Sequence, residues 1–264
     1  MAELRGSRLA AFPATVLVVV ALWEIIATRQ QAAAVPADDA WASAAAVVRV
    51  GHRPGDLIVF APDWADPIGR LHLGDLIPVE MAARMDAARY GRIWELSIRG
   101  AHAKDVTGLV PTEERDVGGV AVRRYDRAPA VVLADVREVL STARSTGGGP
   151  RVELAEVGFE PHRCVVVVPP ASKPVRITFP RLALGSELVG YVGIADVFTR
   201  RDDREPGTLS VEIAGAVVAT VTAGIDAGWV RYQVPTTPGV AEVTFVISSA
   251  SPRRQMCFAA ETRR

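Results

Sequence analysis

The pattern of apolar and polar residues divides this 264-residue chain into three parts. From Leu9 to Thr28 the chain is apolar, and Glu24 is the one charged residue in that run. At about 1.5 Å per residue, a helix of this length spans ~30 Å, which is the thickness of a bilayer's hydrocarbon core. Short apolar segments of mixed period follow up to residue 145. From residue 151 onward the apolar residues alternate with polar ones at a period of two, which is typical of strands with one buried face.

The N-terminal run predicts a membrane anchor or a secretion signal over residues 1–35. Arg5 and Arg8 precede it, and the positive-inside tendency then places the N-terminus in the cytoplasm and the rest of the chain outside it. A signal peptide is the second interpretation, because Ala32–Ala34 offers an A-x-A cleavage site. Trp23 and the apolar residues after it extend beyond the usual end of a signal's apolar region, which favours an uncleaved anchor. A third alternative is a buried helix of a soluble protein.

Residues 36–145 are predicted to form a small α/β domain. A helix that begins at Asp38 or Asp39 places Trp41, Ala44, Ala45, Val47 and Val48 on one face. Further on we expect strands at residues 57–61, 92–98 and 120–124, an apolar segment at 131–133, and helices at 78–88 and 135–144. Strands that alternate with helices indicate a layered domain with a partly parallel sheet.

Residues 151–264 are predicted to form an antiparallel β-sandwich of the jelly-roll type, so that the fold is α+β overall. Residues 146–150, with three consecutive glycines and Pro150, form a predicted linker before it. Four segments carry same-face apolar triplets: Val175, Ile177 and Phe179; Leu209, Val211 and Ile213; Val230, Tyr232 and Val234; and Val243, Phe245 and Ile247. Turn-forming residues separate these segments, as expected for short antiparallel strands.

Charge and cysteine content limit the function classes. Thirty basic and 30 acidic side chains balance, and the chain has no long Lys/Arg run, so we do not expect a nucleic-acid partner. The two cysteines, Cys164 and Cys257, lie in the first and last strands expected for the sandwich. Because such strands often lie side by side, we predict a disulfide between them, which suits an oxidising compartment. Two buried thiols remain the alternative.

The densest polar cluster follows the first predicted strand. Asp63 and Asp66 are candidates for an acid/base pair, with Arg70 and Asp75 nearby and Trp64 as a stacking surface for a sugar ring. Ligands of α/β sheets bind outside the carboxyl ends of the strands, where this loop lies. The alternative is that the aspartates serve the loop's own hydrogen bonds, with Arg70 or Arg92 as an ion-pair partner.

In the predicted sandwich, Arg201, Asp226 and Trp229 are candidate ligand-binding residues. Aromatic rings stack on sugars, and Arg or Asp side chains make paired contacts to hydroxyl groups. The alternative is that Trp229 is a core aromatic residue and that Arg201 belongs to a solvated loop. The four histidines are scattered without the spacing of zinc ligands, so we expect neither a metal site nor a cofactor.

Arg53–Val59 and Arg92–Ser97 resemble segments of the extracytoplasmic α/β domain attached to bacterial family 39 glycosyltransferases of the dolichyl-phosphate-mannose mannosyltransferase type. The resemblance implies a similar domain here. It does not extend to the transferase activity, because this chain has one membrane segment and lacks the membrane-embedded catalytic aspartates. The sandwich, with its Gly228–Trp229 strand, resembles galactose-binding-like modules.

These observations favour a non-catalytic, membrane-anchored extracytoplasmic protein that binds a glycan or a cell-envelope partner. No set of residues has the spacing of a known catalytic motif. Two alternatives remain open: an envelope enzyme that acts on a glycan or lipid-linked sugar through Asp63 and Asp66, and an accessory subunit of a membrane glycosyltransferase.

Overall fold

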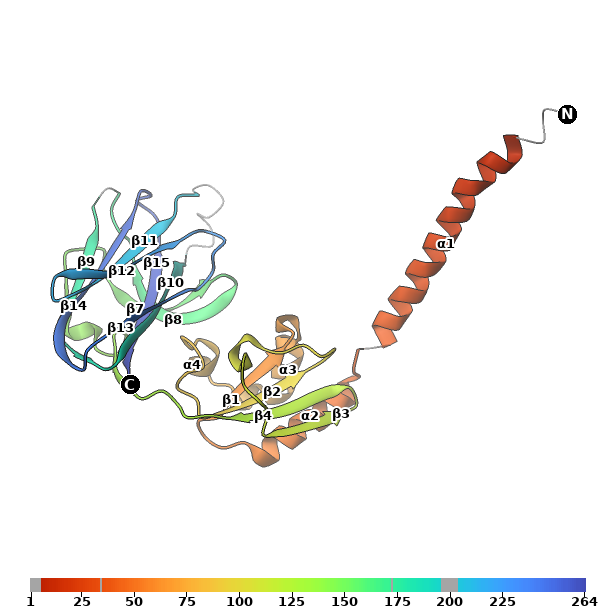
Figure 1. Cartoon of the computed structure of the whole chain (residues 1–264), viewed down its shortest axis with the longest axis horizontal. Coiled ribbons are helices and arrows are strands. Elements are labelled where there is room, and N and C mark those ends of the chain that lie inside the picture. Colours follow the sequence, from red (N-terminus) through yellow and green to blue (C-terminus); the bar gives the residue numbers. More distant parts are fainter. Residues whose placement is uncertain (1–5, 34, 172, 196–203) are drawn as a thin grey trace. The chain divides into compact units, whose positions relative to one another are not determined.

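The computed structural model describes residues 6–33, 35–171, 173–195 and 204–264. Its helices and strands divide between an N-terminal helix, an α/β unit and a β-sandwich unit (Figure 1). The chain passes between the last two units three times. One compact unit contains residues up to Asp75 together with Arg92–Asp126, and the other contains Leu76–Gly91 together with Arg127–Arg264. The predicted linker at residues 146–150 thus lies inside the second unit, between two of its strands.

Helix α1, Gly6–Ala33, contains the apolar run. Its segment Pro13–Gln30 has a mean hydropathy of 1.3, and within the described residues this is the one helix long and apolar enough to cross a membrane. Apolar side chains such as Leu17, Val19 and Leu22 are exposed along it.

The α/β unit has the predicted helix and a partly parallel sheet. Helix α2, Asp38–Gly51, carries two aspartates in its first turn, where the helix dipole favours negative charge, and it buries Trp41, Ala44, Ala45 and Val48. Strand β1, Leu57–Ala61, is wholly buried and pairs in parallel with β2, Arg92–Ser97. The antiparallel strands β4, Val120–Asp126, and β3, Glu113–Val117, extend the sheet. Helix α3, Asp66–Leu73, follows β1.

The sandwich unit consists of two antiparallel sheets. The first has the order β13-β10-β15-β8-β7, with β5 also paired to β15, and the second has the order β12-β11-β14-β9-β6. The strands of the first sheet are β5 Val132–Asp135, β7 Arg151–Val157, β8 Glu160–Val167, β10 Glu187–Ile194, β13 Val230–Pro235 and β15 Met256–Arg263. Those of the second are β6 Arg144–Ser145, β9 Val175–Leu184, β11 Gly207–Ile213, β12 Ala216–Ala223 and β14 Gly239–Ser249.

Alternating side chains from both sheets fill the core of the sandwich. Ile177, Val211 and Phe245 of one sheet face Val165 and Phe258 of the other, and all five are buried. The rings of Phe245 and Phe258 lie 5.1 Å apart. The period of two in the sequence therefore predicted the sandwich correctly.

Two predicted helices are wrong. Residues 78–88 contain only the short helix α4, Val79–Ala82, and continue as turns and bends. Residues 135–144 contain the end of β5 and a short 3-10 turn. At the start of this stretch the Asp135 carboxylate accepts a hydrogen bond from the backbone N–H of Arg137 at 2.9 Å, which favours a turn over a continuing helix.

Candidate functional site

Residues 81–90, the end of α4 and the irregular segment after it, lie on the outer face of the first sheet, and we call them the covering segment. Its backbone bonds to the sheet along its length: Ala83 O accepts from Arg163 N at 3.0 Å, and Met85 O accepts from Trp229 Nε1 at 3.3 Å. Met81, Ala83, Met85 and Ala87 are buried, while the residues between them are partly exposed. Buried and partly exposed residues alternate here, although the backbone after Ala82 forms turns and bends.

The cysteines lie on the same outer face. Cys164 of β8 and Cys257 of β15 form a disulfide with a Cα–Cα distance of 5.6 Å, and both are wholly buried. They cluster with Val157 and Val166. The disulfide thus joins two neighbouring strands of the sheet on which the covering segment lies.

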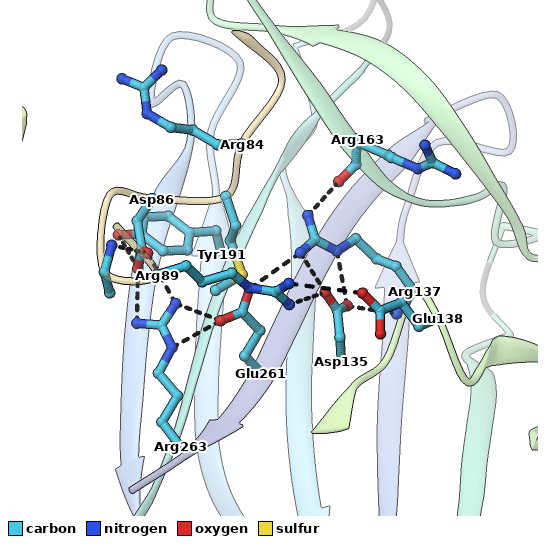
Figure 2. Close-up of polar contacts among 12 residues, drawn as sticks. Arg84, Asp86, Arg89, Asp135, Arg137, Glu138, Arg163, Tyr191, Glu261 and Arg263 are labelled. Atoms are coloured by element: carbon cyan, nitrogen blue, oxygen red, sulfur yellow. Dashed lines mark hydrogen bonds and ion pairs between the residues drawn. The ribbon is translucent and has the colours of Figure 1, made fainter. Parts of the chain in front are cut away.

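A network of charged side chains begins at the covering segment. Arg89 Nε donates to Glu261 Oε1 at 2.9 Å, and its Nη2 donates to Asp135 Oδ2 at 2.5 Å (Figure 2). Arg137 bonds to the same two carboxylates at 2.5–3.1 Å. Asp135 and Glu261 are buried, at 3% and 1% exposure. Each buried carboxylate is therefore held by two guanidinium groups.

Arg263 extends the network on the other side of Glu261. It donates to Glu261 Oε2 at 2.9 Å and binds Asp86 through both terminal nitrogens at 2.9 and 3.0 Å. Tyr191 also donates to Asp86, at 3.5 Å. Burial, with the nearby Asp86 charge, raises the pKa of Tyr191 to about 12, so its phenol stays protonated and acts as a donor.

The charges in this network are maintained by their partners. Burial by itself raises the pKa of Asp135, but the hydrogen bonds and positive charge of Arg137 and Arg89 outweigh it and hold that pKa below its usual range. Burial likewise acts to lower the pKa of Arg137, and Asp135 and Glu261 more than offset it. The groups are therefore ionised and fixed in orientation at neutral pH.

The network forms one wall of a pocket with a volume of about 350 Å³. Glu138, at 71% side-chain exposure, lines the pocket 3.7 Å from Arg89, and the guanidinium groups of Arg84 and Arg163 point away from the network (Figure 2). Carboxylates and guanidiniums supply most of its polar lining: Glu80, Asp86, Asp135, Glu138 and Glu261, and Arg84, Arg89, Arg137 and Arg163. We call this the arginine–carboxylate pocket.

The sequence-derived candidates in the α/β unit lie in separate ion pairs. Asp66 Oδ2 accepts from Arg70 Nε at 2.5 Å along α3, and the Asp75 carboxylate accepts two hydrogen bonds from Arg49 at 2.6 and 2.7 Å. The hydrogen bonds from Arg49 lower the pKa of Asp75. Asp63 is exposed at the start of a short 3-10 helix. Asp66 and Asp75 are therefore each paired with an arginine, Arg70 and Arg49.

Trp64 is 60% exposed, and the guanidinium of Arg99 lies 5.7 Å from its ring centroid. In the sandwich unit, Trp229 stacks on His162, with ring centroids 4.4 Å apart, and on Tyr191 at 5.7 Å. Trp229 is thus engaged with the sheet and the covering segment.

Asp226 pairs with Arg204 at 2.9 Å in an exposed turn, and Arg201 lies outside the described residues. None of the sequence-derived candidates in the described part of the chain lines the arginine–carboxylate pocket.

A further buried carboxylate, Glu95 of β2, has a different environment. It accepts hydrogen bonds from Tyr125 at 2.9 Å and from the backbone N–H of Ala103 at 2.6 Å, and it pairs with Arg123 at 3.3 Å and His102 at 3.1 Å. These contacts fix the loop after β2 onto the sheet. Within the described residues, no group of three or more His, Cys, Asp or Glu side chains has the arrangement of a metal site.

No protein-family model matches the chain, and no curated protein matches it in sequence. Similar solved structures include the M60 catalytic domain of Clostridium perfringens ZmpB with its CBM51-1 and CBM51-2 domains, at 13% identity over 60% of this chain and 20% of that one, with a TM-score of 0.38. Others are CBM51 from C. perfringens GH95 in complex with methyl-galactose (13% identity, 50% of this chain and 99% of that one, TM-score 0.35) and the C-terminal CBM6 of Zobellia galactanivorans LamC (13%, 46% and 98%, 0.28).

The chain thus spans about a fifth of the ZmpB structure and nearly the whole length of the two single modules. These single modules are carbohydrate-binding β-sandwiches. The comparisons do not support the resemblance of residues 53–97 to the domain attached to family 39 glycosyltransferases.

The residues of the pocket carry weak signals in the sequence. Asp135 and Arg137, and Glu261 and Arg263, are opposite charges two residues apart, and that spacing places both members on one face of a strand. Such pairs are also common on solvated strand faces. Only the strand pairing between β5 and β15, with Asp135 opposite Glu261, brings the two pairs together.

Proposed function

We propose that this chain is a membrane-anchored extracytoplasmic protein whose sandwich unit binds a neutral carbohydrate in the arginine–carboxylate pocket. The observation that carries the proposal is the chemistry of the pocket lining. Five carboxylates and four guanidiniums line it, and Arg263 adds a fifth guanidinium behind Asp86. The charges are therefore balanced.

A balanced, paired lining fits a polyhydroxylated ligand better than an anion. Sugar hydroxyls both donate and accept hydrogen bonds, and carboxylates and guanidiniums supply both kinds of partner in fixed planes. An anion would have to compete with Asp135 and Glu261 for the same guanidiniums. The volume of about 350 Å³ is within the usual range of small-ligand pockets, ~300–1,000 Å³.

Pre-organisation also supports binding. Asp135, Glu261 and Arg137 are ordered by one another before a ligand arrives, so binding need not immobilise them again. Glu138 and part of Arg89 remain exposed and are accessible to hydroxyl groups.

Two features support the location. Helix α1 contains an apolar run of bilayer-spanning length that follows Arg5 and Arg8 in the sequence. The disulfide between Cys164 and Cys257 suits an oxidising compartment outside the cytoplasm.

The carbohydrate site predicts specific effects on affinity. The full chain in lipid nanodiscs is expected to bind one or more neutral glycosides from an array that also contains acidic glycans. Glu138→Ala removes an exposed hydrogen-bond acceptor. Arg89→Lys keeps the positive charge but loses the planar guanidinium group, which can form two parallel hydrogen bonds. Each should weaken binding about tenfold in isothermal titration calorimetry, since one charge-assisted hydrogen bond contributes ~1.5 kcal/mol or more.

The matched control is Arg181→Ala, because Arg181 is an exposed arginine on β9 of the other sheet. It should leave the affinity unchanged. Binding of acidic glycans alone, or an affinity that is insensitive to Glu138→Ala and Arg89→Lys, would contradict the proposed site.

The anchor predicts membrane retention and outward topology. A periplasmic reporter fused after Arg264 should be active, and the full-length protein should stay in the membrane fraction after an alkaline wash. Recovery of a mature chain that begins near Val35 would show that the N-terminal segment is a cleaved signal and not an anchor. The chain would still be exported. A fusion that is active only in the cytoplasm would contradict both the membrane anchor and the export of the chain.

A further inference from the structure

A second hollow adjoins the arginine–carboxylate pocket, and its lining is different. It has a volume of about 260 Å³ and is lined by Val79, Ala83, Val152 and Leu154, with Glu80, Glu153 and Arg163 at its margins. We call it the apolar groove. Glu80, Ala83 and Arg163 line both spaces, so the groove and the pocket meet along these three residues.

The apolar side chains of the groove come from two elements. Val79 begins α4 and is 52% exposed, and Leu154 lies on the edge strand β7 and is 56% exposed. An isolated exposed leucine is ordinary on a protein surface. Here two such residues line one hollow that shares Glu80, Ala83 and Arg163 with the polar pocket.

We propose that the ligand is an amphiphilic glycoside, with its sugar in the arginine–carboxylate pocket and a hydrocarbon group in the apolar groove. This inference rests on the proposed carbohydrate function and names the class of ligand. The abrupt change from charged to apolar lining at Arg163 matches a molecule that is polar at one end and apolar at the other. A free sugar would leave the groove empty. A purely apolar ligand would form no hydrogen bonds with the carboxylates and guanidiniums of the pocket.

The hydrocarbon part should contribute affinity through burial alone. Each methylene removed from water gives up to about a fourfold gain in affinity, because its burial contributes ~0.8 kcal/mol. A butyl group adds three methylenes to a methyl group. Partial burial in an open groove still yields a gain that titration calorimetry resolves.

The experiment compares the methyl and n-butyl β-glycosides of glucose, galactose and N-acetylglucosamine on the full chain in nanodiscs. For the sugar that binds, we expect the butyl glycoside to bind at least tenfold more tightly than the methyl glycoside. Leu154→Ser and Val79→Ser should abolish most of that gain and leave the affinity for the methyl glycoside unchanged. Both residues are exposed, so these variants should fold.

Val240→Ser is the matched control, because Val240 is 58% exposed on β14 of the other sheet. It should keep the full gain. Equal affinities for the two glycosides would overturn the amphiphilic ligand and leave the carbohydrate site standing. A gain that survives both Leu154→Ser and Val79→Ser would place the hydrocarbon elsewhere and also overturn it. If neither glycoside of any of the three sugars binds and the glycan array is also silent, the carbohydrate function itself is overturned.

Discussion

Glu261→Ala is expected to lower the free energy of unfolding of the sandwich unit by ~3–5 kcal/mol. Glu261 is 1% exposed, and its two carboxylate oxygens accept hydrogen bonds from Arg89, Arg137 and Arg263. The variant would leave three guanidiniums near one another with a single buried carboxylate, Asp135, and with Asp86. Uncompensated positive charge in a poorly hydrated site is the physical cause of the loss.

The measurement is hydrogen exchange by mass spectrometry on the full chain in nanodiscs, followed in peptides from β8 and β15. These peptides report on the sandwich unit separately from the α/β unit. Denaturant dependence of the exchange then yields the free energy of opening.

The matched control is Asp226→Ala, because Asp226 also accepts a hydrogen bond from an arginine, Arg204, at 2.9 Å. Its side chain is 83% exposed, against 1% for Glu261. Exposed ion pairs contribute ~0–1 kcal/mol, so the control should change little. If Glu261→Ala lowered the free energy of unfolding no more than Asp226→Ala does, the burial of Glu261 would not determine how much the network stabilises the sandwich unit.

The sandwich could be predicted from the sequence because its signal is local and repeated. Triplets such as Val175, Ile177 and Phe179 place every second residue in the core, and that period has one structural interpretation. The helix α2 and strand β1 were predictable for the same reason: Trp41 to Val48 follow a helical period, and residues 57–61 are uniformly apolar.

The covering segment was not predictable by the same method. Residues 81–88, Met-Ala-Ala-Arg-Met-Asp-Ala-Ala, consist of good helix formers, and alanines occupy both the buried and the partly exposed positions. Alanine does not distinguish a period of two from one of 3.6. The choice is made by tertiary contacts, such as the hydrogen bonds from Arg163 and Trp229 to the backbone of Ala83 and Met85.

The arginine–carboxylate pocket was not among the sequence-derived candidates for a related reason. Asp86 and Arg89, Asp135 and Arg137, and Glu261 and Arg263 come from three segments far apart in the chain. Each pair alone looks like a solvated charge pair. The candidates chosen from the sequence were instead clusters of neighbouring polar residues, such as Asp63 to Asp75, in which Asp66 pairs with Arg70 and Asp75 pairs with Arg49 of α2.

Replacing both cysteines, Cys164→Ala together with Cys257→Ala, is expected to destabilise the sandwich unit by ~4–5 kcal/mol. The disulfide closes a loop with a sequence separation of 93, and in the chain-entropy model a cross-link of that span removes this much conformational freedom from the unfolded chain. The same hydrogen-exchange measurement, on β8 and β15, gives the value.

Two comparisons separate the cross-link from packing. The native chain, unfolded, reduced and refolded in reductant, keeps both sulfur atoms in place and loses only the bond. It should be destabilised nearly as much as the double variant, with the remainder due to the small cavities that alanine leaves. Because both cysteines are wholly buried, reductant added to the folded protein should leave the bond intact. A double variant as stable as the native chain would show that pairing β8 with β15 needs no covalent link, and that the covering segment and its ionic network suffice to hold this face of the sheet.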